Sequence, residues 1–147
     1  ATIPGAYDDI AKDPAPGAVL DLPLTVPNLE RAVYVWYQSA HGRPVPWGLN
    51  DPMPRVLLQN RLTTTLIRLE AVRAQTLPPQ LPTLDLVVGA RMLARQEYRY
   101  IVVHEVFYPA YKLQHLEALL VGLFGEPTRY AEDKLQVYRL DWPEEGS

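Results

Sequence analysis

Three histidines in this 147-residue chain could move protons or ligate a metal. His104 ends an apolar run and is followed at once by Glu105, so this pair is the candidate for catalysis. The competing interpretation of His104 is a hydrogen-bonded structural histidine, and His115 fits a solvated helical position. No two histidines have the i, i+4 spacing that aims two imidazoles at one ion, so we expect no metal site.

Several common reaction classes lack their residues here. The chain has no cysteine, which removes disulfides, thiol nucleophiles and thiolate metal ligands. Neither Ser39 nor Ser147 lies in the Gly-x-Ser-x-Gly motif of a nucleophile-elbow hydrolase. The glycines form neither a dinucleotide-binding fingerprint nor a phosphate loop. We therefore expect no cofactor, and the sequence shows no complete catalytic signature.

A second group of residues has the chemistry of a ligand site. Aromatic, amide, imidazole and guanidinium groups follow one another closely along the chain, and they are Tyr37, Gln38, His41, Arg43 and Trp47. Such a set suits a sugar or a phosphate, since aromatic rings stack on sugars and a guanidinium binds anions through paired hydrogen bonds. The alternative is architectural: the aromatic side chains belong to the core, and the histidine and arginine tie a corner together.

The elements that position these residues alternate between strands and helices. The run from Tyr98 to Glu105 is aromatic and β-branched and predicts the central strand, and the apolar run from Ala18 to Leu24 predicts another. Alternating prolines predict an edge strand over 43–47. Amphipathic periodicity predicts four helices, over 28–41, 54–74, 82–96 and 109–124. The tail predicts a hairpin over 128–131 and 135–142.

This order predicts one α/β domain spanning 1–147, with 1–17 as an extended lead-in that has at most one helical turn. The fold is a three-layer-like sandwich with a small, partly parallel sheet and an antiparallel C-terminal hairpin at its edge. Residues 19–22 and 100–103 are expected to be neighbouring parallel strands, buried on both faces.

Charge is spread unevenly along the chain. The net charge of −3 gives no general attraction to nucleic acid, and none is expected as a partner. Residues 54–99 carry seven arginines against three acids, a net charge of 7 − 3 = +4 between two acidic flanks. This segment is either a solvated face that pairs with those flanks or a face that rests on anionic lipid headgroups. No apolar run is long enough to span a bilayer.

Several short motifs in this order carry a resemblance to a known family, and they are AVLDLPL at 18–24, YQSAHGRPV at 37–45, YRYIVVH at 98–104, LFGEP at 123–127 and VYRL at 137–140. The chain resembles the C-terminal soluble part of large bacterial polytopic membrane proteins of the GT-C glycosyltransferase-like type. Those proteins usually continue from the His-Gly-Arg/Lys-Pro segment into a Gly-rich loop with Ser-Arg. Here the loop reads PWGLNDP over 46–52, so ligand contacts in that loop are not carried over.

The resemblance implies a non-catalytic accessory domain on the extracytoplasmic side of the membrane, because the acidic catalytic residues of GT-C enzymes lie in the membrane part. Its partners would be the transmembrane part of the same polypeptide and a glycan or polyprenyl-phosphate sugar. The start without methionine and the end on Gly146-Ser147 lead us to expect a piece of a longer protein. The alternative is a stand-alone small α/β enzyme that uses His104 and Glu105.

Overall fold

A computed structural model of the chain describes residues 4–15, 17–25, 34, 41–45, 53–73 and 82–140. In this part of the chain, a four-stranded sheet has the order β1-β2-β4-β3, and its strands are β1 (Ala18–Leu22), β2 (Tyr98–His104), β3 (Thr128–Tyr130) and β4 (Leu135–Arg139). β1 pairs with β2 in parallel, with Leu20 opposite Ile101. β4 pairs antiparallel with both β2 and β3. The mixed sheet and the C-terminal hairpin predicted from the sequence are thereby confirmed.

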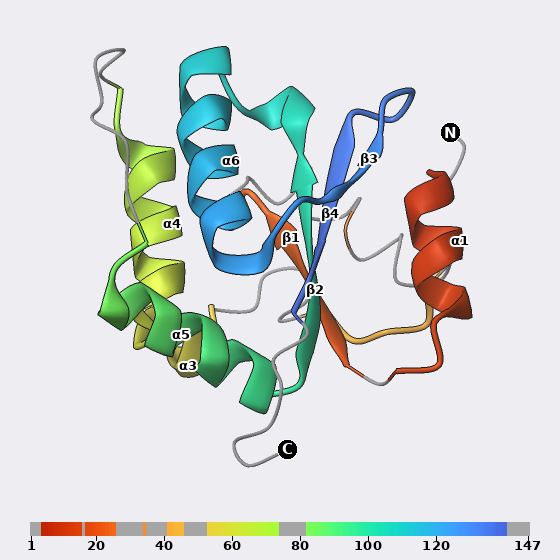
Figure 1. The fold of residues 1–147 in the computed structure, drawn as a ribbon, viewed down its shortest axis with the longest axis horizontal. Coiled ribbons are helices and arrows are strands. Elements are labelled where there is room, and N and C mark those ends of the chain that lie inside the picture. The colour runs from red at the N-terminus through yellow and green to blue at the C-terminus, as the bar shows by residue number, and fades with distance from the viewer. Residues whose placement is uncertain are drawn as a thin grey trace.

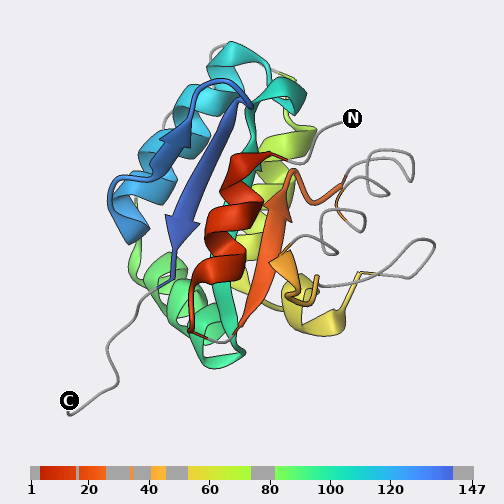
Figure 2. The same cartoon turned by 90° about the vertical axis from the view of Figure 1, so that its right-hand side faces the viewer.

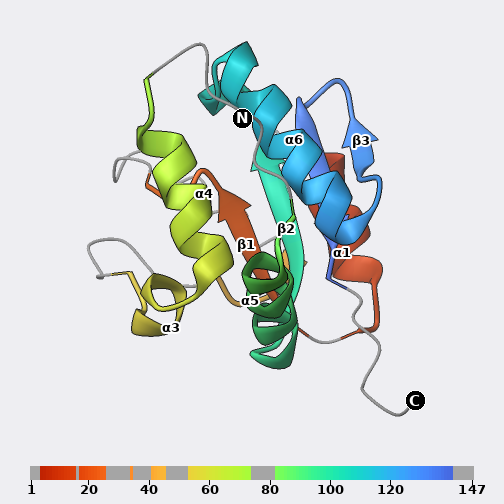
Figure 3. The same ribbon diagram turned by 60° about the vertical axis from the view of Figure 1, so that its left-hand side comes forward.

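Helices cover both faces of this sheet. Figure 1 shows the sheet nearly edge-on, with α1 (Gly5–Lys12) on one side and the remaining labelled helices on the other. Figure 2 looks onto the face that carries α1, and Figure 3 brings the opposite face forward. The helices on that opposite face are α3 (Arg55–Leu58), α4 (Arg61–Ala71), α5 (Leu84–Arg95) and α6 (Ala110–Phe124). The three-layer arrangement follows from these positions.

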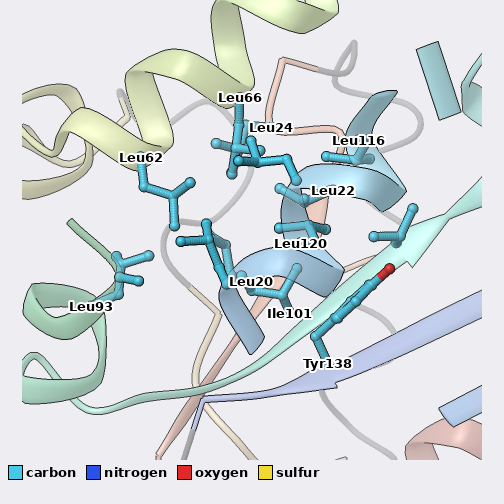
Figure 4. Close-up of a cluster of buried hydrophobic side chains, with 14 of the residues drawn as sticks. Leu20, Leu22, Leu24, Leu62, Leu66, Leu93, Ile101, Leu116, Leu120 and Tyr138 are labelled. Atoms are coloured by element: carbon cyan, nitrogen blue, oxygen red, sulfur yellow. The ribbon is translucent and has the colours of Figure 1, made fainter. Parts of the chain in front are cut away.

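The two cores follow from the alternation of side chains along the strands. Leu20, Leu22, Ile101 and Val103 point toward α4, α5 and α6 and join the larger core, most of which is drawn in Figure 4. The intervening residues of β1 and β2 point toward α1. They form a smaller core with α1 and β4, made of Ala6, Tyr7, Ile10, Val19, Tyr100, Val102, Leu135 and Val137.

The N-terminal segment differs from its prediction. We expected an extended lead-in with at most one turn, and the chain instead forms the eight-residue helix α1. Its prolines lie outside the helix: Pro4 precedes its first residue and Pro14 follows its last turn, where a proline is tolerated. Polar bonds also hold this segment to the sheet. Tyr130 Oη donates to Asp9 at 2.7 Å, Tyr100 Oη donates to Asp13, and Arg139 pairs with Asp13 at 3.3 Å.

The helix predicted over 54–74 is in fact two helices. Asn60 interrupts it, because its Oδ1 accepts hydrogen bonds from the backbone N–H groups of Leu62 and Thr63 and so caps the start of α4. The Asn60 amide also donates to the Gly89 carbonyl at 2.9 Å and joins α4 to α5. The break changes the phase of the apolar stripe. Leu58, which a continuous helix would place in line with Leu62, Leu66 and Leu69, is 53% exposed, and Leu57 is fully buried in its place.

The predicted edge strand over 43–47 is described only as far as residue 45, and residues 42–45 are not part of a strand. They nevertheless run beside β1, because the backbone N–H of Val19 donates to the Pro44 carbonyl at 3.0 Å. Residues 46 and 47 lie outside the described part. In the described ranges, no helix is long and apolar enough to cross a membrane.

A buried acid–base cluster as the candidate functional site

The polar residues closest to catalytic chemistry meet where the parallel strands end. Asp21 lies next to the last residue of β1, and His104 is the last residue of β2. Both side chains point to the face that α1 covers, where the buried Tyr7 meets them. The carboxyl ends of parallel strands are where α/β folds commonly place their sites. We call Tyr7, Asp21, His41 and His104 the buried cluster.

Three atoms of the buried cluster lie within hydrogen-bond distance of one another. Tyr7 Oη is 2.7 Å from Asp21 Oδ1 and 3.0 Å from His104 Nε2, and the last two atoms are 2.8 Å apart. An ionised carboxylate only accepts hydrogen bonds, so the tyrosine hydroxyl and the imidazole Nε2–H both donate to Oδ1. Asp21 thereby orients the His104 ring. Aromatic side chains enclose that ring, with Tyr34 at 4.7 Å between ring centroids.

His41 approaches the cluster from the corner before Gly42. Its Nδ1 accepts a hydrogen bond from the backbone N–H of Arg43 at 2.9 Å, so the neutral ring carries its proton on Nε2. The His41 ring stacks on Tyr7 at 5.4 Å between centroids. Burial lowers the pKa of His41; the Asp21 carboxylate opposes this shift and the Arg43 guanidinium adds to it. His41 is therefore neutral at pH 7.

Two polar atoms of the cluster are buried without a hydrogen-bond partner among the described residues. They are Oδ2 of Asp21, an acceptor, and Nε2 of His41, a donor. Buried polar groups without partners are uncommon because their desolvation is not offset. The two atoms are also chemically complementary, and their residues are close enough for Asp21 to raise the pKa of His41. In the same part of the chain, no three His, Asp or Glu side chains converge as metal ligands.

Arg43, predicted to bind a ligand, is 7% exposed and directs its guanidinium into the protein. Its nitrogens donate to the Ile10 carbonyl at 3.4 Å, the Asp13 carbonyl at 2.9 Å and the Gly17 carbonyl at 3.1 Å. The guanidinium carbon also lies 5.2 Å from the centroid of the Tyr100 ring. These contacts tie the end of α1 and the start of β1 to the His41 corner. Arg43 thus has the architectural role that the sequence analysis gave as the alternative to ligand binding.

Of the other predicted site residues, His41 and His104 lie in the buried cluster, and the remaining ones do not join it among the described residues. Tyr37, Gln38 and Trp47 are outside the described residues, so their part in a ligand site stays a prediction. Glu105 does not join His104. Its carboxylate accepts a hydrogen bond from the Gln136 amide at 2.7 Å, and that amide also faces Glu117 of α6 on the opposite side of the sheet.

Sequence reasoning missed Tyr7 and Asp21 as partners of His104. Asp21 carried a readable signal, because a carboxylate inside a run of buried apolar residues must find a hydrogen-bond donor. Tyr7 carried none, since it was assigned to an extended segment. The cluster places an oriented imidazole beside a carboxylate, which is an arrangement used by general bases. However, His104 and Asp21 are only 5% and 4% exposed, so α1 and its neighbours close the cluster to solvent.

The state of His41 predicts a pH dependence of folding. Its pKa is lower in the folded protein than in the unfolded chain, where it is about 6.5. As the pH falls through that unfolded-state value, the unfolded chain takes up a proton that the folded state excludes, so stability decreases. Urea unfolding at pH 7.5 and pH 5 measures this decrease, and His41→Gln should make it smaller. His115→Gln, at a partly exposed position, is the control. An equal decrease in the free energy of unfolding between pH 7.5 and pH 5 in the parent and in His41→Gln would contradict the lowered pKa of His41.

Comparisons of the chain with protein-family models, with curated proteins and with solved structures found no match.

Proposed function

We propose that the chain is a non-catalytic extracytoplasmic accessory domain of a membrane glycosyltransferase-like protein, and that it binds or positions a glycan or a lipid-linked sugar. The observation that supports the non-catalytic part of this proposal is the separation of the two candidate catalytic residues, and the rest of the proposal comes from the resemblance. His104 is buried beneath α1 with Asp21 and Tyr7, while Glu105 bonds Gln136 on the other side of the sheet. A pair that diverges in this way cannot serve one substrate.

The enclosure of the buried cluster, which keeps substrates away from His104, supports the same proposal. A general base must come within about 2.6–3.2 Å of the proton that it removes. The Nε2–H of His104 points at Asp21 inside the protein, and the rings of Tyr7, Tyr34 and Phe107 surround the imidazole. The cluster therefore supports packing of α1 on the sheet. Under this proposal, the transmembrane part of the same polypeptide supplies catalysis, and Tyr37, Gln38 and Trp47 contribute the sugar contacts.

One observation keeps the alternative, a stand-alone small α/β enzyme, in view. The Asp21–His104 pair has the geometry of an oriented base, so an enzyme of this fold would use His104 with Asp21 instead of Glu105. Such an enzyme would need α1 to move away from the sheet during turnover. The two functions differ in whether the isolated chain turns over any sugar donor.

Incubation of the purified chain with polyprenyl-phosphate sugar donors and acceptor glycans tests the proposal. We expect no transfer product. We expect a short-chain polyprenyl-phosphate sugar donor to bind and to shift the amide resonances of residues 37–47. His104→Ala should bind this donor with the same affinity as the parent. Gln38→Ala and Trp47→Ala should weaken that binding. Product formation that His104→Ala abolishes and His115→Ala preserves would contradict the accessory function and favour the enzyme.

A further inference from the structure

The outward face of α5 carries large apolar side chains that nothing in the described part of the chain covers. Leu84, Val88 and Met92 follow one another at intervals of four residues and so lie along one side of the helix. They are 80%, 45% and 42% exposed. The inward side of the same helix is complete without them, because Leu86, Ala90 and Leu93 fill the larger core. The exposed residues are thus outside this core.

These side chains form a continuous surface with the junction of α3 and α4. Leu84, Val88 and Met92 line a shallow groove of about 560 Å³ together with Gln59 and Arg61. Val56 and Leu58 of α3 are also exposed, at 44% and 53%. Figure 3 shows α3, α4 and α5 together on one side of the sheet. A contiguous exposed apolar patch of this kind is typical of an interaction site.

The segments that carry the groove have a positive net charge. Within residues 53–73 and 82–95 there are six arginines and two acids, a net charge of 6 − 2 = +4 in a chain of net charge −3. All six arginines are exposed, and they are Arg55, Arg61, Arg68, Arg73, Arg91 and Arg95. Both acids have partners in the described part of the chain. Glu70 accepts from the backbone N–H groups of Leu24 and Thr25, and Asp85 pairs with Arg61 at 3.5 Å.

We propose that the outer face of α3–α5 binds the surface of an anionic lipid bilayer. In this arrangement Leu84, Val88 and Met92 enter the boundary between headgroups and acyl chains, and Arg91 and Arg95, on the same side of α5, bind lipid phosphates. Exposed arginines on the same helices as exposed apolar side chains complement a negatively charged, amphipathic interface. The inference rests on the proposed function for the presence of a membrane, and it adds which face of the domain meets it.

The exposed apolar residues Val106 and Phe107 provide an internal contrast. They are 64% and 39% exposed, but they follow the carboxyl end of β2, whereas α5 precedes its start. Their chain neighbour Glu105 is acidic, and no arginine or lysine lies in the flanking residues 100–111. Apolar exposure alone therefore does not distinguish the α5 face. Its combination with arginines does.

Co-sedimentation with vesicles tests this inference with the full chain. We expect binding to vesicles of equal parts phosphatidylcholine and phosphatidylglycerol, and no binding to vesicles of phosphatidylcholine alone. The triple variant Leu84→Gln, Val88→Gln, Met92→Gln and the double variant Arg91→Gln, Arg95→Gln should each weaken binding at least about tenfold. The matched control Val106→Gln should bind as the parent does. Because all of these positions are exposed, circular dichroism should show every variant folded.

Three outcomes would overturn the inference. The first is no binding to anionic vesicles, and the second is equal binding to neutral vesicles. The third is unchanged binding by both the triple and the double variant. Self-association that the triple variant abolishes, without any vesicle binding, would assign the groove to a second copy of this chain instead. The vesicles contain no glycan, so failure here is distinguishable from failure of the sugar-binding experiment.

Discussion

Replacement of Arg43 by alanine is expected to lower the free energy of unfolding by about 3–5 kcal/mol. The substitution removes the donor that the carbonyls of Ile10, Asp13 and Gly17 share, and hydrogen bonds to a charged donor are worth about 1.5–3 kcal/mol each. It also leaves a gap beside Tyr100, over whose ring the guanidinium lies. Urea unfolding followed by circular dichroism measures the change.

Two further variants make this experiment decisive. Arg43→Lys keeps the charge but not the planar set of donors, so it should fall between the parent and Arg43→Ala. Arg68→Ala removes an exposed arginine of α4 and should change stability by no more than about 0.5 kcal/mol. If Arg43→Ala is as stable as Arg68→Ala, while its sugar or phosphate binding is lost, Arg43 is a ligand residue and not an architectural one.

Val102→Asp is expected to leave the chain largely unfolded under native conditions. Val102 is fully buried in β2, between β1 and β4, and its side chain packs in the smaller core. A carboxylate at this position would lie among the apolar side chains of the smaller core and directly opposite Asp21 on β1. Burial of such a charge costs several kcal/mol, a large part of the about 5–15 kcal/mol that stabilises a domain.

The same substitution at an exposed position is the control. Val106→Asp introduces the same charge only four residues away, where the valine is 64% exposed, and it should change stability by no more than about 0.5 kcal/mol. Thermal unfolding of the two variants side by side separates burial from loss of β-branching. Equal midpoints would mean that β2 is not the central strand.

The sequence predicts correctly the parts of the fold in which buried apolar residues follow a regular pattern along the chain. β2 is apolar at successive positions because helices cover both faces of the sheet, and α6 repeats leucine at helical spacing. The errors come from single residues that override a pattern. Asn60 caps the start of α4 within a stretch whose apolar residues repeat at one continuous helical spacing. The prolines that flank α1 led to the prediction of an extended segment where the chain forms a helix.

The candidate site could be predicted only in part, since its contacts join distant positions. His104 was recognisable from its place at the end of an apolar strand. Its partner Asp21 lies 83 positions away, and nothing local shows that Tyr7 would reach both. Likewise, the sequence suggested Arg43 as a ligand residue because a guanidinium binds anions. The carbonyls that it binds belong to segments near Ile10 and Gly17, whose position depends on the fold.

Because of the way in which α1 is attached, we expect its undocking from the sheet and the unfolding of the sheet itself to be separate events. Only Ala6, Tyr7 and Ile10 of this helix enter the core, so hydrogen bonds and ion pairs supply much of its attachment to the sheet. A helix attached in this way can undock at a lower free energy than the strands beneath it can separate. Amide hydrogens of α1 should therefore exchange with solvent before those of β2. The free energy of that undocking sets how often water reaches His104.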